Sequence, residues 1–171
     1  CSSDLTALSG LTVDNSNGIT LNSNVTVSGT LTLTSGRIAT GSNALAIAAS
    51  GSVSGGGAGA YVFGNLKKNV ATGATTRTFE VGDASVYAPV TVAFGNVTVA
   101  GDLTAKSTAG DHPQIASVAI DGAQSVNRYW TLTNSGVSFN SYSATFTFVA
   151  GDLDGGTNTN ALVVGKYNGS T

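Results

Sequence analysis

Short alternating units recur through the first third of the sequence, and this rhythm constrains the fold more than any other feature. In each unit an apolar residue alternates with a small or hydroxyl residue, which is the pattern of a β-strand with one buried face. The units recur at roughly six to eight residues with Gly, Asn or Ser between them, at 10–13, 18–21, 24–27, 30–33, 44–47 and 51–53. Such spacing favours the coils of a parallel β-solenoid over the hairpins of a sandwich.

A glycine-rich stretch separates these units from longer strands. Residues 54–60 read Ser-Gly-Gly-Gly-Ala-Gly-Ala and carry no apolar periodicity, so we place a domain boundary between residues 56 and 57. Seven longer stretches beyond it predict an antiparallel β-sandwich, at 61–66, 76–81, 87–94, 97–105, 126–133, 137–149 and 161–167. The expected fold is therefore all-β, with a short parallel β-solenoid-like part at 1–56 followed by a β-sandwich at 57–171.

All aromatic residues lie beyond this boundary, and most of them are expected in the core of the sandwich. In residues 144–149, for example, Phe146 and Phe148 alternate with Thr145 and Thr147, so both rings share one face. The predicted aromatic core comprises Phe79, Tyr87, Phe94, Tyr129, Trp130, Phe139, Phe146 and Phe148. The first part lacks aromatic residues, so we expect Leu, Ile and Val to fill a narrow solenoid interior.

Charge is scarce and scattered along the chain. Charged residues make up 9% of the 171 residues, with a net charge of -2, against roughly 25% in an ordinary soluble domain. No row of basic residues could neutralise the phosphates of a nucleic acid. No apolar run reaches the roughly 20 residues that a membrane-spanning helix needs. We therefore expect neither a nucleic-acid partner nor a transmembrane helix.

The one cysteine is the first residue, so it has no partner for an internal disulfide. Cys1 followed by two serines resembles the N-terminus of a mature bacterial lipoprotein, in which the thiol carries a lipid anchor. An intermolecular link through Cys1 is the alternative. Both interpretations favour an extracellular or cell-surface location.

Several motifs follow one another along nearly the whole chain. They are LTVDNSNGITL at 11–21, VSGTLTLTSG at 27–36, YVFGNLKK at 61–68, FEVGD at 79–83, NRYWTL at 127–132 and VGKYNG at 164–169. In this order they resemble the repeat regions of large secreted, adhesin-like surface proteins of Bacteroidota and related bacteria. The resemblance implies a structural or adhesive role built from tandem β modules, and it implies no catalytic residues.

Ionisable residues suggest possible reactions, each with a structural alternative. Asp111 and His112 could form an acid–base pair or bind a metal, but a structural zinc site needs further His or Cys ligands, and a loop explains the same residues. Glu80, Asp83 and Asp102 could supply paired glycosidase carboxylates, yet two of them follow glycines at strand ends, where acids are ordinary. We therefore predict no catalytic residue, no cofactor and no enzymatic activity.

Asp152 and Asp154 are weak candidates for a calcium site. They lie in Gly-Asp-Leu-Asp-Gly-Gly at 151–156, which resembles half of a calcium loop with oxygen ligands at alternate positions. The bidentate acid of the complete loop is missing. A turn between two strands explains the same residues.

Exposed aromatic residues define the alternative function, a carbohydrate-binding module. Tyr61, Tyr129 and Tyr142 are its candidate platforms. Because side chains alternate along a strand, we expect Trp130 to pack in the core and the adjacent Tyr129, which follows Arg128, to be half-exposed.

Threonine-rich, nearly uncharged strand edges are the feature that we interpret as functional. Natural monomers usually protect such edges with charged residues or proline, and this chain has only two prolines. We therefore expect a non-catalytic structural or adhesive module that associates with copies of itself or with neighbouring repeats by strand pairing and stacking. Residues 1–8, with Leu5 and Leu8, are a candidate connecting strand.

Overall fold

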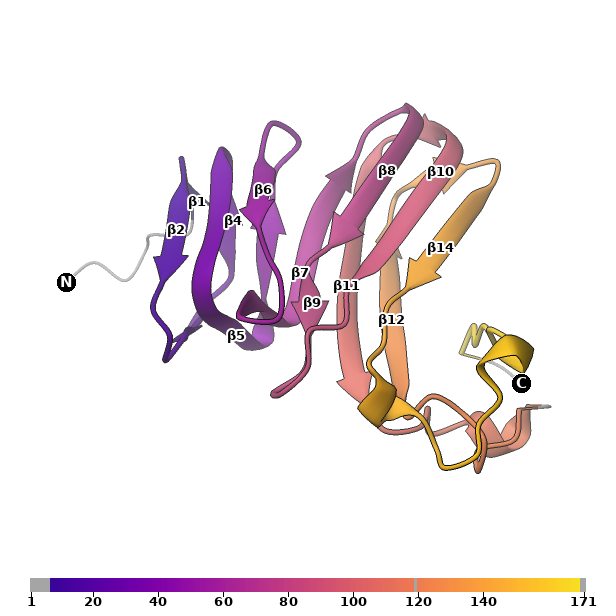
Figure 1. The fold of residues 1–171 in the computed structure, drawn as a ribbon. Coiled ribbons are helices and arrows are strands. Elements are labelled where there is room, and N and C mark those ends of the chain that lie inside the picture. The colour runs from indigo at the N-terminus through magenta and orange to yellow at the C-terminus, as the bar shows by residue number, and fades with distance from the viewer. Residues whose placement is uncertain (1–6, 119, 170–171) are drawn as a thin grey trace.

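A computed structural model describes residues 7–118 and 120–169, and it confirms the all-β fold. A stack of short strands leads into two packed sheets (Figure 1). The strands are β1 (Ala7–Leu8), β2 (Leu11–Asp14), β3 (Ile19–Thr20), β4 (Val25–Val27), β5 (Thr30–Ile47), β6 (Ser52–Gly55), β7 (Ala60–Val70), β8 (Gly73–Phe79), β9 (Val81–Gly82), β10 (Val90–Val99), β11 (Gly101–Ala109), β12 (Arg128–Ser135), β13 (Ser138–Phe139) and β14 (Tyr142–Phe146).

The first strands form the coils of a parallel β-solenoid. The long strand β5 pairs in parallel with β2, β3 and β4 on one side and with β6 and β7 on the other. Leu11 lies beside Leu31, and Leu45 lies beside Leu66, so one coil takes about 20 residues. The predicted parallel solenoid is confirmed.

Aliphatic side chains fill the interior of this solenoid, as the sequence predicts. Leu31, Ile38 and Leu45 of β5 are fully buried, and so are Val62 and Leu66 in the next coil. Leu45 stacks on Leu66 and Ile38 stacks on Val62 because the parallel register repeats from coil to coil.

Strand β7 links the solenoid to the sandwich. One side of β7 pairs in parallel with β5, and its other side pairs antiparallel with β11, which in turn pairs with β12. A single ten-stranded sheet therefore runs through both parts. The parallel stacking continues past the glycine-rich segment, and the division at residues 56 and 57 stays a prediction.

A second sheet covers one face of β7, β11 and β12 and completes the sandwich (Figure 1). In it β10 pairs antiparallel with β8 on one side and with β13 and β14 on the other. Phe79 and Phe94 are buried between the sheets, and Trp130 and Phe146 pack against this core with ring centroids 4.9 Å apart.

Several predicted strands differ from the observed ones. The short units predicted at 30–33 and 44–47 belong to one 18-residue strand, β5. The stretches 97–105 and 137–149 are each divided, between β10 and β11 and between β13 and β14. The stretch 161–167 is not a strand, and Val163 and Val164 are 70% and 77% exposed. Alternating apolar residues form a strand only where a neighbouring strand offers backbone partners, and none lies beside 161–167 within the described part of the chain.

Helical structure in residues 7–118 and 120–169 is limited to three 3₁₀ turns, at Ile115–Ser117, Ala150–Asp152 and Thr159–Ala161. None of these is long and apolar enough to cross a membrane.

Candidate functional site

The first coil of the solenoid has a free edge in the part of the chain that the structure describes. Strands β2 and β3 each pair with β5 on one side, and no described strand pairs with their other side. Strand β1 pairs in parallel with β4, on the side of β4 that faces away from β5, and so belongs to the same outermost layer as β2 and β3. This edge lies at one end of the stack, and the sandwich lies at the other (Figure 1).

Aliphatic side chains at this end are only partly covered. Leu11 and Ile19 are half-buried, although Leu31 and Ile38, which lie beside them in the next coil, are fully buried. Val13 of β2 is already buried. A further coil stacked on β2 and β3 would bury the remaining apolar surface.

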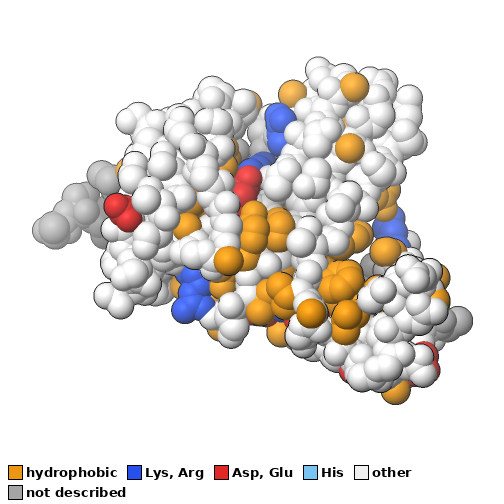
Figure 2. Space-filling view, viewed as in Figure 1, with side chains coloured by type: hydrophobic (Ala, Val, Ile, Leu, Met, Phe, Trp, Pro, Cys, Tyr) orange, Lys and Arg blue, Asp and Glu red, His pale blue; other side chains and the backbone are white. Residues whose placement is uncertain are grey.

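Charged residues are almost absent from this end. Asp14 is the one charged residue between positions 7 and 29, and that segment has no proline. Lysines and prolines are the common protection of free strand edges. Figure 2 shows that the visible face carries only a few scattered charged side chains.

Polar ladders, which the sequence analysis did not identify, hold two corners of the solenoid together. At one corner the Asn43 side chain donates to the Leu21 carbonyl (3.0 Å), and Asn65 donates to the Asn43 carbonyl (2.9 Å). At another, the Ser28 hydroxyl donates to the Leu8 carbonyl (3.0 Å), and Ser50 donates to the Ser28 carbonyl (2.9 Å). The spacing of 22 residues between Asn43 and Asn65 and between Ser28 and Ser50 was the available sequence signal.

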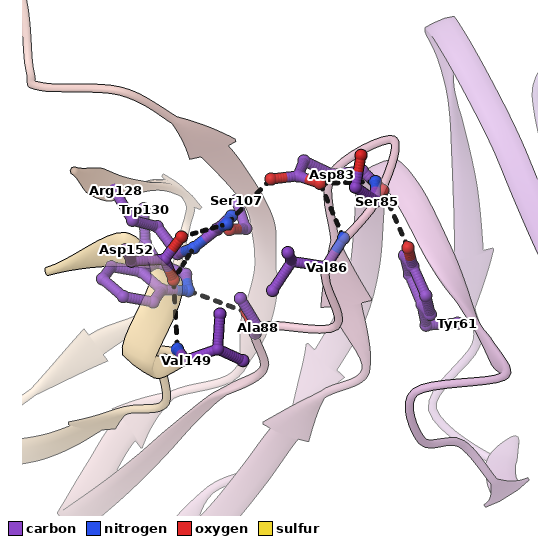
Figure 3. Close-up of polar contacts among 10 residues, drawn as sticks. All are labelled: Tyr61, Asp83, Ser85, Val86, Ala88, Ser107, Arg128, Trp130, Val149 and Asp152. Atoms are coloured by element: carbon purple, nitrogen blue, oxygen red, sulfur yellow. Dashed lines mark hydrogen bonds and ion pairs between the residues drawn. The ribbon is translucent and has the colours of Figure 1, made fainter. Parts of the chain in front are cut away.

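A buried ion network is centred on Arg128 at the start of β12 (Figure 3). Its guanidinium donates two hydrogen bonds of 2.8 Å to the two carboxylate oxygens of Asp152. It also contacts the Asp83 carboxylate at 2.8 Å and donates to the Ser107 hydroxyl at 3.0 Å. The Arg128 side chain is 1% exposed. Its planar guanidinium therefore joins β12 to the segments that carry Asp83 and Asp152.

Asp83 connects this network to the solenoid. Its carboxylate accepts hydrogen bonds from the backbone N–H groups of Ser85 (2.6 Å) and Val86 (2.8 Å), and its carbonyl accepts one from the Tyr61 hydroxyl (3.0 Å). Burial acts to raise the pKa of Asp83, but these N–H groups and Arg128 together hold that pKa below its ordinary value.

The two calcium candidates serve this same region. Burial opposes ionisation of Asp152, but the bonds from Arg128 and from the Val149 N–H hold its pKa below the ordinary value. Asp154 accepts hydrogen bonds from the Ser125 N–H (2.9 Å) and the Asn127 amide (2.7 Å), which also lower its pKa. The guanidinium of Arg128 and the N–H donors of Ser125 and Asn127 thus already bind the carboxylate oxygens that a calcium ion would need. A calcium site at Asp152 and Asp154 stays a prediction.

The three acids considered for glycosidase chemistry have separate partners. Glu80 pairs with Lys68 at 2.6 Å, Asp83 pairs with Arg128, and Asp102 pairs with Lys67 at 3.3 Å. Burial lowers the pKa of Lys68 despite the opposing charge of Glu80. Each of these carboxylates lies against a different cation, an arrangement that explains them as structural ion pairs.

Asp111 and His112 also have different partners. The Ser125 hydroxyl donates to the Asp111 carboxylate (2.9 Å), whereas the His112 ring packs against Tyr129 and Tyr167 at about 5 Å between centroids. Within residues 7–118 and 120–169, no three His, Cys, Asp or Glu side chains gather in a way that could hold a metal ion.

The three tyrosines considered as sugar platforms have different environments. Tyr61 is 1% exposed, so its assignment as an exposed platform is wrong, because the loop that carries Asp83 and Tyr87 covers its ring. Tyr129 is half-buried as predicted, and Tyr142 is 42% exposed. The Trp130 ring packs on the core, and its N–H donates to the Ala88 carbonyl at 2.9 Å.

The N-terminal predictions fall partly outside the described residues. Cys1, as a lipid anchor or intermolecular link, and Leu5 both lie there, whereas Leu8 belongs to β1.

No protein family, no curated protein and no solved structure matches this chain. The resemblance to bacterial surface proteins therefore stays a prediction.

Proposed function

We propose that this protein is an extracellular or cell-surface structural module, adhesive rather than catalytic, which acts by assembly. The assembling element is the free edge of β2 and β3. A coil from a second copy or from a neighbouring repeat stacks there in parallel and extends the solenoid by one turn.

The observation that carries the proposal is the difference in burial between the first and second coils. Leu31 and Ile38 are 0% exposed, whereas Leu11 and Ile19, which lie beside them at the free edge, are half-buried. Stacking would remove apolar side chains from water and would pair free backbone groups of β2 and β3, and both effects favour association.

The proposed cell-surface location rests on composition. A surface rich in Ser, Thr, Asn and Gly with only 9% charged residues is unusual for an ordinary soluble domain.

The experiment compares the mass in solution, together with electron microscopy, of the native chain and an edge variant, Thr12→Lys/Thr20→Lys. Both threonines are exposed on β2 and β3, so the lysines add charge at the edge without removing core. We expect the native chain to form larger assemblies and the variant to remain monomeric. The control is Thr72→Lys/Asn140→Lys, which adds the same charge in exposed turns.

Two outcomes would contradict assembly through this edge. One is a native chain that stays monomeric at all concentrations up to the millimolar range. The other is an edge variant that assembles as the control does, which would move the association to another part of the surface.

A further inference from the structure

A groove crosses the outer face of the solenoid where β3, β5 and β7 lie side by side. It encloses about 280 Å³, and Asn17, Thr20, Arg37, Ala39 and Phe63 are among the residues that line it. This volume is close to the lower end of the range of roughly 300 to 1,000 Å³ for small-molecule sites. The groove therefore has room for a ligand about the size of a sugar unit.

The parallel register explains why the face is hollow at this point. Thr20, Ala39 and Phe63 occupy one row across the three strands, while the neighbouring Ile38 and Val62 point into the core. Ala39 has the smallest side chain of this row, so it forms the floor between two higher walls.

Phe63 stands out on this face because its ring is 36% exposed, whereas the adjacent Val62 is fully buried. The residue beside Phe63 in the next coil is Gly82. Gly82 has no side chain that could cover the ring, and a Cβ there would lie 2.6 Å from the Tyr61 ring. One aromatic surface is thus left open to a ligand.

Arg37 supplies an uncompensated positive charge at the same groove. Among the described residues its guanidinium makes no ion pair and no hydrogen bond, and Asp14 is the one acid between positions 7 and 66. By contrast, Lys67, Lys68 and Arg128 all pair with carboxylates. The donor fork of Arg37 is available for an anion from outside the chain.

We infer that this groove binds a carboxylate-bearing sugar, such as a uronic acid unit of an acidic polysaccharide. The sugar ring stacks on Phe63 while its carboxylate accepts hydrogen bonds from Arg37. Arg37 lies beside Tyr61 in the register, two residues from Phe63, so the two backbone positions are about 8 Å apart. One sugar ring with its carboxylate spans that separation.

The position of the groove favours a sugar over a peptide. Its floor lies on β5, which is already paired on both sides with β3 and β7, so a peptide strand cannot pair with the floor of the groove. The other walls, Asn17 and Thr20, carry uncharged polar groups suited to ring hydroxyls. The inference concerns the face of the solenoid and does not depend on assembly at its free edge.

The test is a titration of the full chain, followed by amide chemical shifts, with trigalacturonate and with its methyl ester. The ester keeps the rings and removes the charge. We expect saturable binding of the acid with the largest shifts around Arg37, Ala39 and Phe63, and at least about tenfold weaker binding of the ester, because hydrogen bonds to a charged group are among the stronger polar contacts.

Three variants and one control locate the site. Arg37→Gln and Phe63→Ala should each weaken binding of the acid about tenfold or more, and Ala39→Leu should do so by filling the floor while leaving both partners in place. Tyr142→Ala, which removes an exposed aromatic ring from the other sheet, should bind as the native chain does.

Several results would overturn the inference. The native chain could fail to bind the acid, or it could bind the acid and the ester equally. Arg37→Gln and Ala39→Leu could both keep native-like affinity. An acidic peptide could bind the groove more tightly and displace the sugar. Phe63→Ala could lose binding because it fails to fold. Ala39→Leu removes no contact of the core, so loss of binding in that variant would point to the groove itself.

Discussion

The solenoid and the sandwich are built from similar strands but are stabilised in different ways. In the solenoid, the same kind of aliphatic residue recurs in register from coil to coil, and neutral Asn and Ser ladders tie the corners. In the sandwich, two antiparallel sheets enclose aromatic residues, and buried ion pairs join the elements. Between positions 7 and 66 the chain has two charged residues, Asp14 and Arg37.

This difference determines which part can be extended. A sandwich buries its apolar faces against each other and so completes its own core. A solenoid coil has two edges, and each needs a neighbour. The solenoid described here has the sandwich on one side and a free edge on the other, so growth by stacking of a further coil is expected at β2 and β3.

The largest effect is expected from breaking the ion network of the sandwich. Arg128→Met would leave Asp83 and Asp152 buried without their cation, at a cost of about 3 to 5 kcal/mol in the free energy of unfolding. Urea denaturation measures the loss. Lys106→Met on the adjacent strand β11 is the matched control and should change the free energy of unfolding little. Equal losses in both variants would show that the ion network contributes no more to stability than an ordinary side chain of the sandwich.

A second substitution compares the inner coil with the end coil. Ile38→Ala, at a fully buried position, should cost about 2 to 5 kcal/mol. Ile19→Ala, at the half-buried position beside it, should cost less than half as much in dilute solution. If stacking covers Ile19, the difference between the two variants should shrink as protein concentration rises, and equal losses in dilute monomer would contradict a free edge.

Acidification should weaken the sandwich through Asp83 and Asp152. Their pKa values in the folded chain lie below the ordinary value, which is about 3.9 in an unfolded chain. The associated stabilisation is therefore complete above that pH and is lost as the pH falls through the folded-state values. The stability difference between native chain and Arg128→Met should narrow from pH 7 to pH 2, and a difference that stays constant would contradict this assignment.

The smallest effect is expected at a corner of the solenoid. Asn65→Ala removes the hydrogen bond to the Asn43 carbonyl and should cost about 1 kcal/mol. Asn140→Ala, in an exposed turn, is the control and should be neutral. A neutral Asn65→Ala would mean that the ladder contributes no measurable stability.

The sequence was informative wherever the signal was local. Alternation predicted the parallel strands before residue 56 and their buried faces, because side-chain direction repeats every two residues in any strand. It did not predict that the units 30–33 and 44–47 join in the 18-residue strand β5. The same reasoning failed for 161–167, where the alternation is present but no described strand lies alongside. It also missed the Asn43 and Asn65 ladder, since a spacing of 22 residues acquires meaning only when the coil length is known.

The sequence by itself determined the all-β fold and the aliphatic interior of the solenoid, because periodicity and composition select local structure and its buried face. It determined the aromatic core of the sandwich in part: Phe79, Phe94, Trp130, Phe139 and Phe146 belong to the core cluster, whereas Tyr87, Tyr129 and Phe148 do not. Only the tertiary structure decided that Arg128 would meet Asp83 and Asp152, that Tyr61 would be covered, and that Arg37 and Phe63 would share a groove. These contacts join residues from different strands and loops, and their formation depends on register and packing, which no local pattern encodes.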